Sequence, residues 1–175
     1  MAAPFLASNR RGDAWFFVGL ASSFPNITDP AEGTVADMRF CGQDLAPSCK
    51  VFQVPRADSS QASEVDQVEI VEATLAARDL KDQVLVFRYK DKFHAVNNQC
   101  PHSSYPLSNG TPFDIEDFGV VLSAGITCPK HGWSFDLFSG NADRGTYKLS
   151  LWEIQVRPAR EDEQEVWVRR KQRIG

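Results

Sequence analysis

Two short runs of the sequence carry the residues with the strongest potential for metal chemistry, because each holds one cysteine and one histidine. They are Cys100-Pro101-His102 and Cys128-Pro129-Lys130-His131. Two sulfur and two nitrogen donors suit a tetrahedral zinc ion, and they equally suit a [2Fe–2S] cluster in which histidines replace two cysteines. The residues therefore predict a metal site formed by Cys100, His102, Cys128 and His131.

The spacing of these donors favours one of the two kinds of metal site. Structural zinc sites usually take two cysteines or two histidines from one tight turn, because both ligands must reach a single ion. Here each run is mixed. Two mixed runs fit a flat cluster of two irons, if each run gives its cysteine to one iron and its histidine to the other. A structural zinc site stays as the less favoured alternative.

The two runs resemble the signature of the Rieske family, C-x-H followed by C-x-x-H, and the resemblance is close over residues 84–157. Further segments match the family in type and order: Pro106-Leu107, Gly110, Gly132-Trp133-Ser134-Phe135-Asp136 and Ser139-Gly140. The resemblance implies a Rieske-type [2Fe–2S] cluster held by Cys100, His102, Cys128 and His131. It also implies an all-β fold with a small cluster-binding subdomain of two ligand loops.

Three departures from the family pattern refine this hypothesis. Tyr105 and Lys130 stand where the membrane-complex members carry a disulfide beside the cluster, so the chain resembles the soluble ferredoxin branch. Its reduction potential is then expected in the lower part of the Rieske span of about −150 to +300 mV. Ser104 stands where the family commonly has glycine, which implies either a strained turn or an extra hydroxyl donor. The interval between His102 and Cys128 is several residues longer than usual.

Length and composition limit the remaining possibilities. The chain has 175 residues, of which 42% are hydrophobic and 24% charged, as expected for one globular domain. A net charge of −4 leaves no basic surface for nucleic acid. No apolar run is long enough to span a membrane, and the first residues lack the core of a signal peptide. We therefore expect a cytoplasmic protein without a membrane or nucleic-acid partner.

The domain organisation follows from the placement of polar and apolar segments. A flexible N-terminus is predicted over residues 1–13, followed by a single Rieske domain over residues 14–170. The cluster-binding loops are expected at about residues 98–140. Segments rich in small and polar residues predict variable loops at about 21–48 and 55–65, and the long interval between the ligand runs predicts a third at 111–118.

Apolar and β-branched residues, several in alternation, predict short strands that must position the two ligand runs. The segments are 14–20, 50–54, 67–71, 84–89, 92–97, 152–156 and 165–169. They are expected to form an antiparallel β-sandwich or partial barrel. Residues 73–80 have a helical composition and predict one or two helical turns.

Three other features are expected to be structural. Cys41 and Cys49 are predicted to be free thiols, since disulfides are rare inside cells. His94 lies in the middle of a predicted strand without a nearby cysteine, and a core histidine is the expected role. Trp133 alternates with other apolar residues and is expected in the core.

The resemblance implies a one-electron carrier that passes electrons from a reductase to an acceptor enzyme. Each iron of such a cluster already has four ligands, so no position is open for a substrate, and catalysis by this chain alone is not expected. The alternative is a Rieske subunit of a larger oxygenase or of a nitrite-reductase-like complex. The reductase, the acceptor and the oligomeric state are left open.

Overall fold

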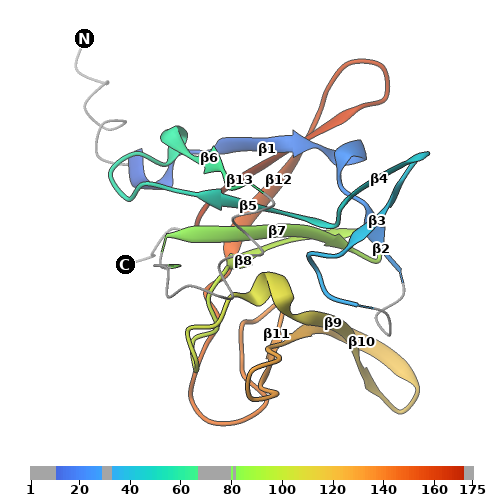
Figure 1. The fold of residues 1–175 in the computed structure, drawn as a ribbon, viewed down its shortest axis with the longest axis vertical. Helices are drawn as coiled ribbons and strands as arrows, with labels where there is room; N and C mark the ends of the chain where they lie inside the picture. Colours follow the sequence, from blue (N-terminus) through green and yellow to red (C-terminus); the bar gives the residue numbers. More distant parts are fainter. Residues whose placement is uncertain (1–10, 29–32, 67–79, 81, 172–175) are drawn as a thin grey trace.

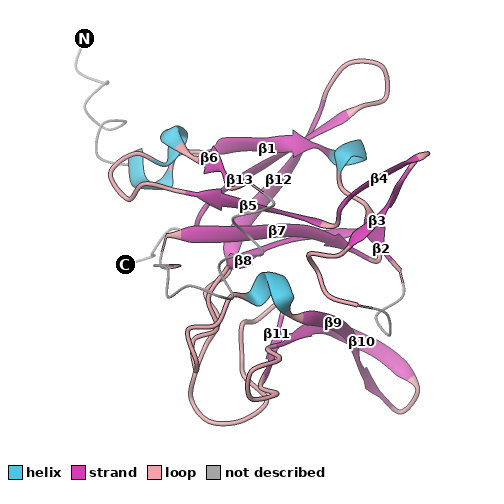
Figure 2. Cartoon of the chain, viewed as in Figure 1, coloured by secondary structure: helices cyan, strands magenta, loops and turns pink. Residues whose placement is uncertain are grey.

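Strands joined by turns make up the described chain, and short 3-10 helices are the only helical elements within it (Figure 2). The computed structural model describes residues 11–28, 33–66, 80 and 82–171. The predicted all-β class is confirmed. The strand predicted at 67–71 lies outside the described residues, and so do the helical turns predicted at 73–80, apart from Leu80. No helix among the described residues is long and apolar enough to cross a membrane.

The predicted strands agree with the structure to within two residues wherever they can be compared. Six strands correspond to the six predicted segments in the described chain: β1 (Phe16–Leu20), β5 (Cys49–Gln53), β7 (Gln83–Tyr89), β8 (Lys92–Asn97), β12 (Trp152–Pro158) and β13 (Gln164–Arg170). All their pairings with one another are antiparallel. One further pairing differs from the prediction, because the short strand β2 (Asn26–Ile27) runs parallel to the end of β7.

Strand β7 lies at the centre of the fold and is buried on both faces. It pairs with β5 and β8, and β5 also pairs with β6 (Ser63–Glu64). Successive side chains of a strand point to opposite faces of the sheet. Val84 and Val86 accordingly join one hydrophobic core, while Leu85 and Phe87 join another. The central sheet therefore separates two cores.

The first core lies between the central sheet and the three-stranded sheet of β1, β13 and β12. Phe16 and Val18 of β1 pack there with Val166 and Val168 of β13, and all four side chains are buried. This pair of packed sheets is the predicted sandwich, and Figure 1 shows it in the upper part of the molecule.

The second core lies on the other face of the central sheet, where it carries the metal-site residues. A three-stranded sheet of β9 (Thr111–Asp117), β10 (Val120–Thr127) and β11 (Ser134–Asp136) covers it, in the lower part of Figure 1. Cys100 and Cys128 belong to this core together with Leu85 and Phe87. The two cysteines are thus buried in the packed interior.

The prediction of a loop at 111–118 is wrong, because these residues form β9 and the start of a tight turn to β10. Phe118 and Gly119 make that turn with positive φ angles of 51° and 76°. Phe113 pairs with Gly125 and Ile115 with Ser123, so the extra residues lengthen a hairpin. The acidic residues had hidden the strand pattern, since one face of this hairpin meets solvent.

The other two predicted loops also contain ordered structure. Within 21–48 lie the 3-10 helix η2 (Ala21–Ser23), β2 and a hairpin of β3 (Met38–Cys41) with β4 (Asp44–Pro47). Within 55–65 lie the 3-10 helix η3 (Ser59–Gln61) and β6. Short two- and four-residue strands leave too few apolar positions for a period to be visible in the sequence.

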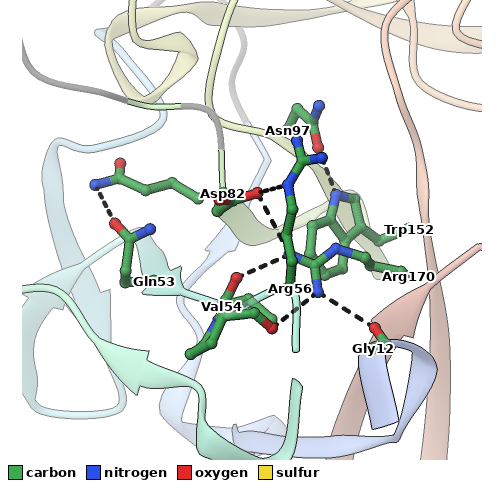
Figure 3. A network of polar contacts seen from close by, with 10 residues as sticks. Gly12, Gln53, Val54, Arg56, Asp82, Asn97, Trp152 and Arg170 are labelled. Atoms are coloured by element: carbon green, nitrogen blue, oxygen red, sulfur yellow. Dashed lines mark hydrogen bonds and ion pairs between the residues drawn. The ribbon is translucent and has the colours of Figure 1, made fainter. Parts of the chain in front are cut away.

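Arg170 ties the two ends of the chain to the central sheet (Figure 3). Its guanidinium donates hydrogen bonds to the carbonyl oxygens of Val54 at 2.8 Å and Gly12 at 3.2 Å. Asp82 lies 3.6 Å from the same guanidinium and accepts a bond from Arg56. Residues 11–13 were expected within a flexible terminus. They form the 3-10 helix η1 (Arg11–Asp13), which contains Gly12.

Candidate metal centre

The first ligand loop is a closed turn that starts at Cys100. The backbone N–H of Cys100 donates to the carbonyl of Tyr105, and the N–H of Ser104 donates to the carbonyl of Cys100, both at 2.8 Å. Ser104 closes this turn in the left-handed region, with φ of 58°. This conformation favours glycine and costs an ordinary residue about 1 kcal/mol. The sequence left open whether Ser104 strains the turn or adds a hydroxyl donor. The backbone shows the strained turn.

The second ligand loop repeats the same hydrogen bonds from Cys128. The N–H of Cys128 donates to the carbonyl of Trp133 at 2.8 Å, and the N–H of Gly132 donates to the carbonyl of Cys128 at 3.0 Å. Gly132 has φ of 74° and occupies the position that Ser104 holds in the first loop. The two loops are therefore backbone copies of one turn.

The structure brings all four predicted ligand residues together at the facing ends of these loops. Cys100 and Cys128 are 0% and 1% exposed. The Ser103 hydroxyl and the Cys128 sulfur form a hydrogen bond of 3.5 Å across the gap between the loops. The rings of His102 and His131 lie edge to face with centroids 5.2 Å apart. The cysteines form the inner end of the site and the histidines the outer end.

The two thiols interact strongly with each other. A hydrogen bond from the Cys128 thiol, supported by Ser103 and by the backbone of His102, lowers the pKa of Cys100. Donation of that bond, together with burial, raises the pKa of Cys128. One thiolate is thus already stabilised, and thiolates are the form of cysteine that binds metals.

The two imidazoles differ in their surroundings. His102 is partly buried and stacks on Trp133 with a centroid distance of 4.0 Å and an interplanar angle of 10°, whereas His131 is exposed. The Nδ1 atom of His102 is buried and has no hydrogen-bond partner among the described residues. A buried imidazole nitrogen without a partner fits a metal ligand. The donor set of two buried sulfurs and two imidazoles fits a [2Fe–2S] cluster with mixed ligands.

The segment from Gly140 to Tyr147 covers the first histidine, and sequence reasoning missed it. Tyr147 packs edge-on against both His102 and Trp133, at 5.4 and 5.3 Å. Gly145 passes so close to Trp133 that an added Cβ would lie 3.1 Å from the indole. Trp133, expected in the core, instead lies between that core and His102. Only the small residues Gly145 and Thr146, directly before Tyr147, hint at this close approach.

The remaining expected residues take simpler places. Pro106 and Leu107 are buried next to the first loop. Cys41 and Cys49 are free thiols in the described structure, and burial raises the pKa of Cys49 to about 12. His94 is 5% exposed within β8.

Comparison with known proteins places these observations in a family. The family described as the Rieske [2Fe-2S] domain matches residues 49–151, which is more than half of the chain. The ferredoxin subunit of methanesulfonate monooxygenase from Methylosulfonomonas methylovora is 31% identical over 75 residues, covering 42% of this chain and 54% of that one. Methylxanthine N1-demethylase NdmA from Pseudomonas putida is 29% identical over 90 residues, covering 51% of this chain and 20% of that one.

A solved structure shows a similar but partial likeness. The complex of reduced oxygenase and oxidised ferredoxin in carbazole 1,9a-dioxygenase has a chain that is 27% identical, with a TM-score of 0.38, covering 53% of this chain and 75% of that one. The protein spans only about half or less of the length of the curated relatives it matches. The family match covers both ligand loops and makes a [2Fe–2S] cluster, rather than a zinc ion, the cofactor. The chain belongs to the Rieske [2Fe-2S] domain family.

Proposed function

We propose that this protein is a one-electron carrier whose [2Fe–2S] cluster is held by Cys100, His102, Cys128 and His131. The observation that carries the proposal is the pairing of two loops that are closed by equivalent backbone hydrogen bonds and present buried cysteines at one end and imidazoles at the other. When bound, the cluster supplies a centre that accepts and releases a single electron. The resemblance of the chain to a ferredoxin subunit supports the same role.

The residues around the site keep water away from its inner end. Leu107 and Phe135 are 0% and 1% exposed and belong to the core that contains both cysteines. A dry surrounding lowers the local dielectric constant and helps to set the potential of a metal site. No disulfide cysteine stands at Tyr105 or Lys130, which supports a potential in the lower part of the Rieske span.

The outer end of the site is where a redox partner would dock. His131 is exposed, and Lys130 beside it is exposed as well. Arg144 reaches the same loop, with its guanidinium over the Trp133 ring at 5.5 Å. The acidic side chain next to it, Asp143, accepts bonds from Arg144 and from the backbone of Ser134. Because Asp143 balances the charge of Arg144, Lys130 is the positive charge that this face offers to an acidic surface of a reductase or acceptor enzyme.

Asp114 of the β9–β10 hairpin is less suited to such docking. Asp114 accepts a hydrogen bond of 2.8 Å from the Tyr89 hydroxyl and forms an ion pair with Lys90. The ammonium group of Lys90 holds the pKa of Asp114 below its usual range. Its charge is neutralised locally, so a basic partner gains little from it.

The proposal is tested on the purified protein by its absorption and by its EPR spectrum after reduction with dithionite, with iron, zinc and sulfide measured on the same sample. Two irons and two sulfides per chain, with the rhombic signal of a histidine-ligated cluster, are the expected result. A colourless protein holding one zinc contradicts it.

A second experiment separates a free carrier from a subunit of a larger complex. We expect the protein in a native cytoplasmic extract to elute from a size-exclusion column near the volume expected for its 19.5 kDa chain. Elution only at a much larger size, with an oxygenase or reductase in the same fractions, would favour the subunit alternative.

A further inference from the structure

A groove of about 420 Å³ lies between the β7–β8 hairpin and the β9–β10 hairpin, and it is separate from the ligand loops. Its volume falls within the range of about 300–1,000 Å³ that is typical of small-molecule sites. Lys92 and His94 come from one side, Val121 and Leu122 from the other, and Phe138 closes one part of it.

The apolar wall of this groove is unusually exposed for large hydrophobic side chains. Val121, Leu122 and Phe138 are 54%, 65% and 53% exposed. Val121 and Leu122 lie on β10, in the hairpin that is lengthened by the additional residues between the two ligand runs. Exposed apolar side chains that gather around a concavity are a mark of a binding site.

One positive charge at the groove is not neutralised by any carboxylate of the described residues. Lys90 is paired with Asp114, so these two charges cancel. Lys92 has no carboxylate partner within the described parts of the chain, and its ammonium lies 5.2 Å from the centre of the Phe138 ring. The groove therefore combines an apolar wall with a single available cation.

His94 adds a buried polar atom that lacks a partner. The side chain is 5% exposed, and its Nε2 atom makes no hydrogen bond to any described residue. Aromatic rings flank the imidazole, with Phe87 at 5.5 Å and Phe138 at 5.1 Å. Burial and the charge of Lys92 lower the pKa of His94 to about 4, so the ring is neutral at pH 7. A buried polar group without a partner destabilises the folded protein, and a ligand that supplies a partner relieves this cost.

We propose that this groove binds a small amphipathic carboxylate. The apolar body of the ligand packs on Val121, Leu122 and Phe138, and its carboxylate pairs with Lys92 beside the imidazole of His94. A single lysine suits a monoanion, whereas phosphate groups are commonly held by several donors or by arginine. The site is independent of electron transfer, so it goes beyond the function proposed above.

Octanoate tests the proposal with the full, cluster-loaded protein in isothermal titration calorimetry, supported by amide NMR shifts of β8 and β10. Saturable binding of one octanoate per chain is expected. Lys92→Gln is expected to weaken it about fivefold, as loss of one exposed charge pair predicts. Octanol, which has the same apolar chain without the charge, should bind more weakly to the unchanged protein by a similar factor.

Two controls keep the test decisive. Lys171→Gln removes another exposed lysine away from the groove and should leave octanoate affinity unchanged. Leu122→Ser removes an exposed part of the wall and should weaken octanoate and octanol alike. Absence of saturable binding, or equal affinity of Lys92→Gln and the unchanged protein, overturns the proposal. Neither result touches the cluster, whose EPR signal reports the proposed electron-carrier function separately.

Discussion

The two ligand loops share one backbone but hold their histidines differently. Each loop closes with the same pair of hydrogen bonds around its cysteine. His102 nevertheless lies partly buried under Trp133 and Tyr147, while His131 is exposed. The cysteine end of the site is therefore symmetric and the histidine end is not. We infer that one histidine is held in place and the other is presented to a partner.

The loops also differ at the residue that closes each turn. Ser104 and Gly132 both adopt a left-handed conformation, which glycine reaches without strain and serine does not. The first loop thus carries backbone strain that the second lacks. The first loop is also the one whose histidine packs against Tyr147.

The largest effect is expected where the loops are alike. Cys100→Ser and Cys128→Ser should each abolish the cluster, because both thiolates lie in the dry core and neither has a neighbouring substitute among the described residues. Iron and sulfide analysis should fall from two of each per chain to near zero. Cys41→Ser is the matched control and should keep full loading. Full loading of either ligand variant would contradict the assignment.

A smaller effect is expected where the loops differ in backbone strain. Gly132→Ser should destabilise the loaded protein by about 1–2 kcal/mol, which is the cost of left-handed backbone for an ordinary residue. An added Cβ at Gly132 meets no atom within 4 Å, so a clash does not contribute. For a chain of this size the apparent Tm should fall by about 2–8 °C. Circular dichroism at fixed heating rate measures it.

Ser104→Gly is the reciprocal control for that change. It removes the strain of the first loop and loosens the unfolded chain, and the strain is the larger of the two effects, so a net gain of up to about 1 kcal/mol is expected. Its Tm should therefore rise by up to about 4 °C. A large fall in both variants would show that side-chain contacts, rather than φ angles, distinguish the two loops.

The family, its [2Fe–2S] cluster and the main strands could be predicted from the sequence because their signals are local. The mixed cysteine and histidine runs indicate the family within a few residues, and β7 shows a continuous apolar run. The lengthened hairpin of β9 and β10 could not be predicted in this way. Acidic residues on its exposed face conceal the strand pattern, and pairing partners rather than composition make it a strand.

The asymmetry of the histidines depends on contacts between distant segments. Trp133 and Tyr147 are separated in sequence, and their packing on His102 follows from the path of the chain after β11. The groove around Lys92 likewise brings together residues from β8 and β10 that share no motif. Such sites require the tertiary fold before they can be recognised.

Trp133→Leu should test whether the ring stacked on His102 affects the midpoint potential of the cluster. Loss of the stacked ring admits water to the His102 end of the site, and water favours the reduced cluster because it carries the additional negative charge. The midpoint potential should rise by less than about 59 mV, the equivalent of about 1.4 kcal/mol for one electron. Trp167→Leu, on the distant β13 strand, should leave the potential unchanged. A fall in potential would contradict this account of the stacking.

The smallest effect concerns the exposed histidine and the charges around it. If Lys130 attracts acidic partners to His131, the anion ferricyanide should oxidise the reduced protein faster than expected for a protein with a net charge of −4. Arg144→Gln leaves the charge of Asp143 unbalanced, and should then slow that reaction about twofold at low salt and have no effect at high salt, where exposed charges are screened. Arg160→Gln, in the turn between β12 and β13, should not slow it. Equal rates for the two variants would mean that the charges around His131 do not attract an anionic partner. Access to His131 would then depend on the shape of the surface alone.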